Sequence, residues 1–222
     1  MDRLPVAVLI SGRGSNLRAL LDASARPEFP ARVALVVSDV RGAEGLKIAA
    51  EAGVPTTVVD SDPADRTVFD DAARRRIDAA GARLVCLAGF LRILGPAFVE
   101  HYRDRLLNIH PSLLPAFPGL RVHARVLESG ARVSGCTVHF VRPEVDSGPI
   151  VLQVAVPVHA DDTAETLDAR VRDMEHRAYP QTVQWFAEGR LRVENERVTV
   201  AGAGSPATVL ANPDPRTTAA GS

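Results

Sequence analysis

The sequence predicts an α/β fold with a Rossmann-like, doubly wound and mostly parallel sheet flanked by helices. Short apolar runs such as Val6–Ile10, Val33–Val37 and Leu84–Ala88 are typical of strands that are buried on both faces of a parallel sheet. Between them lie longer segments in which apolar residues recur at helical spacing. Strands that alternate with helices in this way form right-handed βαβ units, and such units build a doubly wound sheet.

In the first half of the chain, five strands and three helices are expected. In chain order they are strand Val6–Ile10, helix Asn16–Ala25, strand Val33–Val37, helix Ala43–Ala52, strand Thr56–Val59, helix Arg66–Ala80, strand Leu84–Ala88 and strand Leu106–Ile109. Leu17, Leu20 and Leu21 define the buried face of the first helix. Gly53 and Gly81 each follow a helix at the position where a left-handed residue commonly ends it.

After His110 the strict alternation gives way to a loop and longer elements. Residues 111–121 are rich in proline and glycine and predict a long loop, and long ordered loops in compact domains tend to be functional. The remaining expected elements are strands Ser134–Val141 and Ile150–Val156, the joining loop Arg142–Pro149, a helix over Thr163–Glu188 that Asp161-Asp162 caps and Pro180 bends, and a hairpin of Leu191–Val193 and Arg197–Val200 around Glu194-Asn195. Residues 1–200 are expected to form one domain, and Ala201–Ser222 a flexible tail, since the tail has almost no apolar pattern.

The composition is that of an ordinary globular protein, because 46% of the 222 residues are hydrophobic and 24% are charged. A net charge of −1 gives no reason to expect binding to nucleic acid or to a membrane surface. No apolar run is long enough to span a membrane, and the N-terminus leads directly into the first strand without a signal peptide. A soluble cytoplasmic protein is therefore expected. Cys86 and Cys136 make no disulfide framework, and Cys86 is expected to be a buried free thiol.

A glycine-rich turn, Ser11-Gly12-Arg13-Gly14-Ser15-Asn16, joins the first strand to the first helix. Glycines allow such a turn to bring its backbone N–H groups close to an anion, with Ser15 or Asn16 capping the helix. Leu17 takes the place of the third glycine of a dinucleotide-binding turn, and the Gly-Lys-Ser/Thr ending of an NTP-binding loop is absent. A single phosphate monoester therefore fits better than NAD or ATP. On these residues alone, a tight turn without a ligand explains the sequence equally well.

Two polar residues end the last strand of the parallel series. Asn108 and His110 are two positions apart, so their side chains point to the same face of the sheet. Such a pair alone is more often structural, but the glycine-rich turn lies at the same carboxyl edge, where open α/β sheets bind ligands. Asp146 is either an ordinary turn residue before Ser147-Gly148-Pro149 or a carboxylate that stabilises the protonated form of His110. No metal site is expected, because none of the six histidines lies at zinc-helix spacing.

Four segments together resemble the phosphoribosylglycinamide formyltransferase family of folate-dependent enzymes. They are Ile10-Ser11-Gly12-Arg13-Gly14-Ser15-Asn16-Leu17, Leu87-Ala88-Gly89-Phe90-Leu91-Arg92-Ile93-Leu94, Leu107-Asn108-Ile109-His110-Pro111-Ser112-Leu113-Leu114-Pro115 and Asp146-Ser147-Gly148-Pro149. They occur in the family's order and spacing, and the resemblance runs from about Val6 to Val200. It implies the formyltransferase fold, with a phosphate-binding half of about residues 1–105 and a folate-binding and catalytic half of residues 106–200.

The resemblance implies transfer of the formyl group of 10-formyltetrahydrofolate to the amine of glycinamide ribonucleotide, a step of purine synthesis. Asn108, His110 and Asp146 would then be catalytic, with Asn108 and protonated His110 donating hydrogen bonds to the developing oxyanion. The substrate-binding residues implied are Gly14, Ser15, Asn16 and Glu175. The folate-binding residues implied are Arg66, Leu91, Arg92, Ile93, Leu94 and Asn108, while Thr137 and His139 line the same cleft.

Three residues depart from the family's pattern. Arg121 stands where the family often has the first histidine of a His-x-His pair, so no catalytic role is assigned to that position. Arg13 stands where relatives often carry asparagine, and its guanidinium would add positive charge beside the phosphate. Ser147 replaces a common glycine in a turn, which is a mild change.

The nearest alternative function is that of a formyltetrahydrofolate deformylase, which gives the formyl group to water. Such relatives usually carry an additional N-terminal regulatory domain, whereas the first strand here begins at Val6. Methionyl-tRNA formyltransferase fits less well, since it adds a C-terminal RNA-binding domain and this chain is not basic. A nucleotide-binding sensor without catalysis would leave Asn108, His110 and Asp146 without a purpose. The expected partners are the two small-molecule substrates, and the sequence leaves open a monomer or a homodimer.

Overall fold

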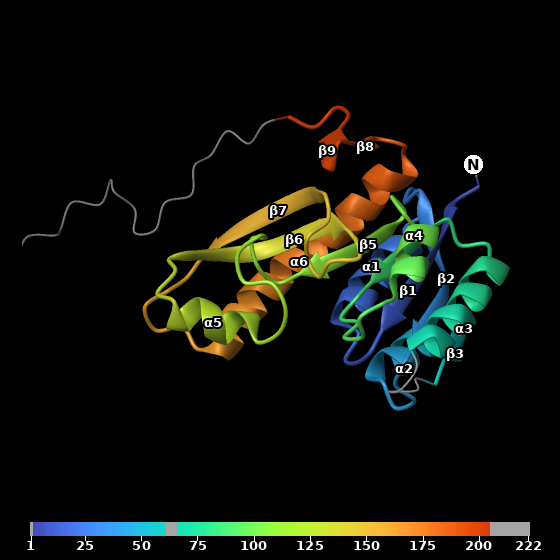
Figure 1. The fold of residues 1–222 in the computed structure, drawn as a ribbon, viewed down its shortest axis with the longest axis horizontal. Coiled ribbons are helices and arrows are strands. Elements are labelled where there is room, and N and C mark those ends of the chain that lie inside the picture. Colours follow the sequence, from blue (N-terminus) through green and yellow to red (C-terminus); the bar gives the residue numbers. More distant parts are fainter. Residues whose placement is uncertain (1, 61–65, 205–222) are drawn as a thin grey trace, which may run out of the picture.

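A seven-stranded sheet with helices on both faces forms the body of the protein (Figure 1). The computed structural model describes residues 2–60 and 66–204. The strands of the sheet are β1 (Leu4–Ile10), β2 (Ala31–Ser38), β3 (Thr56–Val58), β4 (Leu84–Leu87), β5 (Leu106–His110), β6 (Val133–Phe140) and β7 (Ile150–Pro157). The helices are α1 (Ser15–Ala25), α2 (Glu44–Glu51), α3 (Arg66–Ala79), α4 (Pro96–His101), α5 (Val122–Glu128) and α6 (Ala164–Ala187), and a hairpin of β8 (Leu191–Glu194) and β9 (Arg197–Val200) follows.

The order of the strands creates a crevice at the carboxyl edge of the sheet. The order is β3-β2-β1-β4-β5-β6-β7. Strands β2 and β3 therefore lie on one side of β1, and β4 and the strands that follow it lie on the other side. The turns that follow β1 and β4 meet there, because Ser11 N–H donates to the carbonyl of Gly89 over 3.2 Å and Leu91 N–H donates to Ser11 Oγ over 3.0 Å. Such a reversal of strand order is where doubly wound sheets bind ligands.

The prediction of a mostly parallel, doubly wound sheet is confirmed. Strands β1 to β5 pair in parallel, and β6 and β7 add antiparallel strands at one edge. The antiparallel pairing of β7 with β6 follows from the sequence, since the loop between them is too short for the crossover connection that parallel strands need. Antiparallel pairing also places residues of β6 directly opposite the polar end of β5, so the site has two walls.

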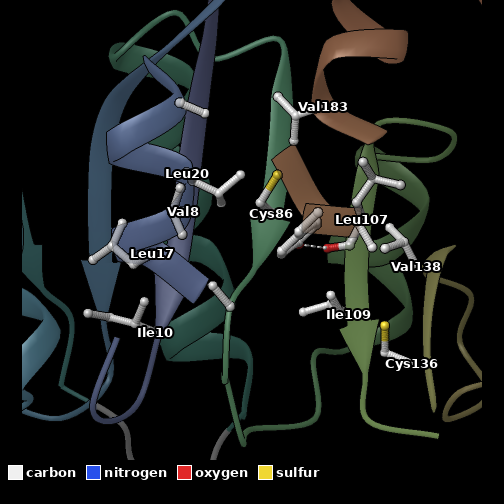
Figure 2. Close-up of a cluster of buried hydrophobic side chains, with 14 of the residues drawn as sticks. Val8, Ile10, Leu17, Leu20, Cys86, Leu107, Ile109, Cys136, Val138 and Val183 are labelled. Carbon is white, nitrogen blue, oxygen red and sulfur yellow. Dashed lines mark hydrogen bonds between the residues drawn. The ribbon is translucent and has the colours of Figure 1, made fainter. Parts of the chain in front are cut away.

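Alternating side chains of the sheet pack into two separate apolar layers. Helices α1, α2, α5 and α6 cover one face, while α3 and α4 cover the other. In Figure 2, Leu17 and Leu20 of α1 lie against Val8 and Ile10 of β1. Cys86 lies in the same layer as a buried free thiol, as predicted. No helix within the described residues is long and apolar enough to cross a membrane.

Helix α6 is anchored to the centre of the sheet by one hydroxyl. Tyr179 is fully buried, and its hydroxyl lies 2.9 Å from the carbonyl oxygen of Leu87 in β4 and 3.0 Å from that of Leu107 in β5. Because Glu175 precedes Tyr179 by about one helical turn, this anchor also sets where the Glu175 side chain lies. The helix continues through Pro180 as a single element.

Two short helices were not predicted from the sequence. Helix α4 has six residues and α5 has seven, which is too short for a helical period to be recognised. Helix α4 begins with Pro96, whose missing N–H is no loss in a first turn. Helix α5 begins after Arg121, which adopts a left-handed conformation with φ of 54°.

Three predictions about caps and turns were wrong. Gly14, rather than Ser15 or Asn16, precedes α1, and the helix has no side-chain cap. Thr163, rather than Asp161-Asp162, caps α6 through a reciprocal pair of hydrogen bonds with Thr166. The turn of the hairpin is Asn195-Glu196, since both residues have positive φ, and Glu194 belongs to β8. The side chain of Arg66 and residues 205–222 of the expected tail lie outside the described residues.

Candidate active site

The catalytic residues proposed from the sequence meet at the end of β5. Asn108 and His110 project from β5, and Asp146 comes from the loop between β6 and β7. His110 Nδ1 lies 3.4 Å from Asp146 Oδ2, and both side chains are more than nine-tenths buried. The backbone N–H of Gly119 donates to the same carboxylate oxygen over 2.8 Å. An N–H on Nδ1 of this ring therefore faces a carboxylate oxygen that can accept its hydrogen bond.

The second nitrogen of the His110 ring also faces an acceptor. His110 Nε2 lies 3.0 Å from the carbonyl oxygen of Phe117, in the long loop of residues 111–121. Both ring nitrogens therefore face oxygen atoms, and an N–H on either nitrogen can donate to the oxygen that it faces. An N–H of this ring is also the kind of group that stabilises a developing negative charge.

Asn108 is oriented by a neighbouring histidine on β6. Asn108 and His139 are cross-strand partners, and Asn108 Nδ2 lies 3.2 Å from His139 Nε2. Burial lowers the pKa of His139, so its ring is neutral. His139 Nδ1 lies 3.0 Å from the carbonyl of Phe140 and carries the hydrogen, which leaves Nε2 to accept a hydrogen bond from Asn108. The second hydrogen of the Asn108 amide then remains for a ligand.

The glycine-rich turn after β1 has the conformation of an anion-binding loop. Gly14 has φ of +76°, a left-handed value that favours glycine. Because α1 has no side-chain cap, the N–H groups of its first turn are left for an anion. Arg13 is exposed in this turn.

Asn16 and Glu175, two residues that the resemblance assigns to the substrate, lie in direct contact. Asn16 Nδ2 donates to Glu175 Oε2 over 2.8 Å, although the residues are 159 positions apart in the chain. Both are 8% exposed. Burial raises the pKa of Glu175, and the Asn16 hydrogen bond partly opposes that effect. The buried Asn16 Oδ1 has no partner among the described residues.

The segment after β4 presents apolar side chains and one cation. Leu91 and Ile93 are 70% and 49% exposed, so this segment offers two apolar side chains to a ligand. Leu94 is buried in the core beneath α3 and α4, so it can contribute only its backbone to a ligand. Arg92 lies over the ring of Phe69, and its buried Nε and Nη2 have no hydrogen-bond partner among the described residues. These features suit a flat ring system that carries an acidic tail.

The site has no arrangement of ligands for a metal ion. Within residues 2–60 and 66–204, no group of three or more histidine, cysteine, aspartate and glutamate side chains is placed to hold one. The polar groups that the described residues bring to the site include an amide, a carboxylate and an imidazole.

The sequence matches the family model described as formyl transferase over residues 4–183. The chain belongs to the formyl transferase family. It is 46% identical to the phosphoribosylglycinamide formyltransferase of Escherichia coli over 198 residues, which cover 89% of this chain and 93% of that protein. It is 50% identical to the trifunctional purine biosynthetic protein adenosine-3 of Gallus gallus over 193 residues, 86% of this chain, but it spans only 19% of that relative's length.

Solved structures agree with this assignment. Glycinamide ribonucleotide transformylase 1 from Symbiobacterium toebii superposes with a TM-score of 0.86 at 49% identity, covering 90% of this formyl transferase and 94% of that chain. A formyltetrahydrofolate deformylase from Pseudomonas syringae has nearly the same fold, with a TM-score of 0.84 over 89% of this chain and 66% of that one. Its identity is 27%, so the similarity in sequence favours the ribonucleotide enzymes.

The formyl transferase site includes residues that the sequence did not indicate. Thr137 Oγ1 donates to the carbonyl of Ser112 over 2.6 Å and accepts from the N–H of Leu114 and from Gln153 Nε2, both over 3.0 Å. These bonds hold the loop that supplies the Phe117 carbonyl to His110. The resemblance places Thr137 beside the cleft, but Gln153 and Phe117 carry no local signal of such a role.

Proposed function

We propose that this formyl transferase transfers the formyl group of 10-formyltetrahydrofolate to the amine of 5′-phosphoribosylglycinamide. The products are formylglycinamide ribonucleotide and tetrahydrofolate, in de novo purine biosynthesis. The observation that carries the proposal is the cluster of Asn108, His110 and Asp146 at the same carboxyl edge of the sheet as the glycine-rich turn, in a chain 46% identical to a phosphoribosylglycinamide formyltransferase. The exposed Leu91 and Ile93 and the unpaired Arg92 suit the folate co-substrate, which supplies the formyl group.

The residues of the site would supply hydrogen bonds to the developing oxyanion and a path for the proton that is transferred. Negative charge develops on the formyl oxygen when the substrate amine attacks the formyl carbon, and it needs hydrogen-bond donors. Asn108 would donate its second amide hydrogen, and protonated His110 would donate by exchanging its contact with Phe117. Asp146 would keep His110 charged. It would also accept the proton that the substrate amine loses, and this proton would then pass to the folate nitrogen as the bond between that nitrogen and the formyl carbon breaks. No covalent bond to the protein is required.

The substrate would be held from its other end by the turn after β1. Gly14, Ser15 and Asn16 would bind the phosphate through backbone N–H groups at the start of α1. Glu175 would bind the same substrate from α6, with Asn16 fixing its carboxylate. Arg66 would bind the folate together with the segment Leu91–Leu94. Residues of about 1–105 would hold the phosphate and residues 106–200 would supply the catalytic groups, while the folate segment Leu91–Leu94 and Glu175 cross this division.

A turnover assay tests the proposal. The protein is mixed with 10-formyltetrahydrofolate, and loss of the formyl group is followed spectroscopically with and without the ribonucleotide. Product that forms only with the ribonucleotide is expected. Product that forms equally without it would establish a deformylase, and binding without product would establish a non-catalytic sensor. The variant His110→Ala should lower the rate by about 100- to 1000-fold, since it removes one oxyanion donor.

The proposal extends to the working form of the enzyme. It acts in the cytoplasm on two small-molecule substrates, without a metal ion and without nucleic acid or membrane as partner. It is a monomer or a homodimer, and light scattering after size-exclusion chromatography distinguishes these two. Activity that survives extensive treatment with a chelator is the result expected for a mechanism without a metal.

A further inference from the structure

The turn after β1 packs directly against the start of helix α2. Gly45, the second residue of α2, donates its backbone N–H to the carbonyl of Gly12 over 3.1 Å. A Cβ added to Gly14 would lie 2.7 Å from the Cα of Gly45, closer than real Cβ atoms approach. Two backbones therefore touch here without any side chain between them. The position of the turn depends on α2 as well as on β1 and α1.

Gly45 has no room for a side chain. A Cβ at Gly45 would lie 2.6 Å from Ile10 Cδ1, 3.2 Å from Gly14 Cα and 3.4 Å from the carbonyl oxygen of Gly12. Its φ does not lie in the left-handed region, so the backbone itself permits alanine. Alanine is also the better helix former of the two residues. Space alone, and not backbone conformation or helix propensity, therefore requires glycine at this position.

We propose that Gly45 is a positioning residue for the phosphate of the ribonucleotide substrate. Its N–H group and its missing side chain hold Gly12–Gly14 from behind, so that the N–H groups that begin α1 converge on one anion. The inference rests on the proposed function, because it takes the turn to be the phosphate site. Gly45 itself touches no substrate and acts through the turn.

The variant Gly45→Ala tests this role. The added methyl group forces the turn to move by a few tenths of an ångström, and a misplacement of about 1 Å can cost roughly 100-fold in rate or binding. We expect KM for the ribonucleotide to rise about 5- to 10-fold. KM for the folate and kcat should stay within about twofold of wild type, because Gly45 contacts Gly12 and Gly14 directly, whereas the folate segment meets the turn at Ser11. A ribonucleotide KM within twofold of wild type, or an equal rise in both KM values, would overturn the proposal.

Gly42 provides a matched control. It lies three residues before Gly45, in the connection between β2 and α2, and a Cβ there meets nothing within 4 Å. Gly42→Ala should therefore leave all three kinetic constants unchanged. A ribonucleotide KM that rises equally in Gly42→Ala and Gly45→Ala would contradict a role for the contact with the turn.

A second variant keeps the test informative if Gly45→Ala folds poorly. Ile10→Val removes Cδ1, the atom that the new methyl group would meet at 2.6 Å. The double variant should fold, and its ribonucleotide KM should fall between those of wild type and Gly45→Ala. If the double variant has the same ribonucleotide KM as Gly45→Ala, steric pressure on the turn does not cause the weaker binding. If Gly45→Ala cannot be purified and the double variant has a wild-type KM, that explanation is excluded as well.

The unphosphorylated riboside separates this inference from the proposed function. If the proposed function is wrong, the wild-type protein itself fails to formylate the ribonucleotide. If only the role of Gly45 is wrong, the wild type prefers the ribonucleotide and Gly45→Ala shows the same preference. The proposal requires that Gly45→Ala lose affinity for the ribonucleotide while its weaker use of the riboside equals that of the wild type.

Discussion

Replacing Tyr179 by phenylalanine removes a single oxygen atom from the centre of the protein. The ring stays in place, because phenylalanine has the same shape apart from the hydroxyl. What is lost is the one donor that lies 2.9 Å from the Leu87 carbonyl and 3.0 Å from the Leu107 carbonyl. Both acceptors are in strands that are buried on both sides, so water cannot take the place of the hydroxyl.

The size of the effect follows from this burial. Leaving a buried acceptor without its donor costs about 1–3 kcal/mol. In a domain of this length, each kcal/mol lowers Tm by roughly 2–4 °C. We therefore expect Tyr179→Phe to lower Tm by about 2–12 °C. Because the Leu107 carbonyl directly precedes Asn108, turnover should fall together with stability.

Thermal or urea unfolding measures the change, and Tyr102→Phe is the matched control. Tyr102 is also buried, but its hydroxyl donates over 2.8 Å to Asp78, whose side chain is 38% exposed. Water can hydrate that carboxylate after the substitution, so the loss should be about 1 kcal/mol or less. If Tyr179→Phe is no less stable than Tyr102→Phe, the hydroxyl does not anchor helix α6 in the way inferred from its contacts.

Three further predictions concern the site. Asp146→Asn removes the carboxylate beside His110. In steady-state kinetics kcat should fall about 100-fold or more while both KM values change little. A wild-type kcat would refute the catalytic role of Asp146. Glu175→Gln should weaken binding of the ribonucleotide about 10- to 100-fold, as measured by titration calorimetry, without changing the affinity for the folate. If the variant and the wild type bind the ribonucleotide with equal affinity, Glu175 is not part of the substrate site. Burial lowers the pKa of His139 in the folded protein. Below about pH 6.5 this histidine is therefore protonated in the unfolded chain but still neutral in the folded protein, so the free energy of unfolding decreases as the pH drops. Urea unfolding between pH 7 and 5 should show a flatter profile for His139→Gln than for wild type, and parallel profiles would count against a neutral His139.

Much of the fold could be predicted because the signals are local. The apolar runs of β1, β2 and β4 and the periodic helices between them depend on residues that are neighbours in the chain. Asn108 and His110 could be placed on one face because strand side chains alternate. Helices α4 and α5 could not be predicted, since six or seven residues are too few to show a period.

The resemblance to a family supplied what local patterns could not. Asp146 is by itself an ordinary turn residue, and Glu175 is an ordinary helical glutamate, so no pattern in the sequence pairs them with other groups. The structure brings Asp146 to His110 and Glu175 to Asn16. The roles that the resemblance assigns to these residues remain predictions until the variants are measured.

The sequence by itself determined the strands, the glycine-rich turn and the polar end of β5, because hydrophobic periodicity and steric limits on the backbone act over a few residues. Only the tertiary structure decided which distant groups meet. The contact of Gly45 with Gly14 and the pairing of Asn16 with Glu175 join elements that are separate in the chain. Such contacts exist only after the sheet has formed and the helices have packed on it, since the apolar layers on its two faces set the distances between elements.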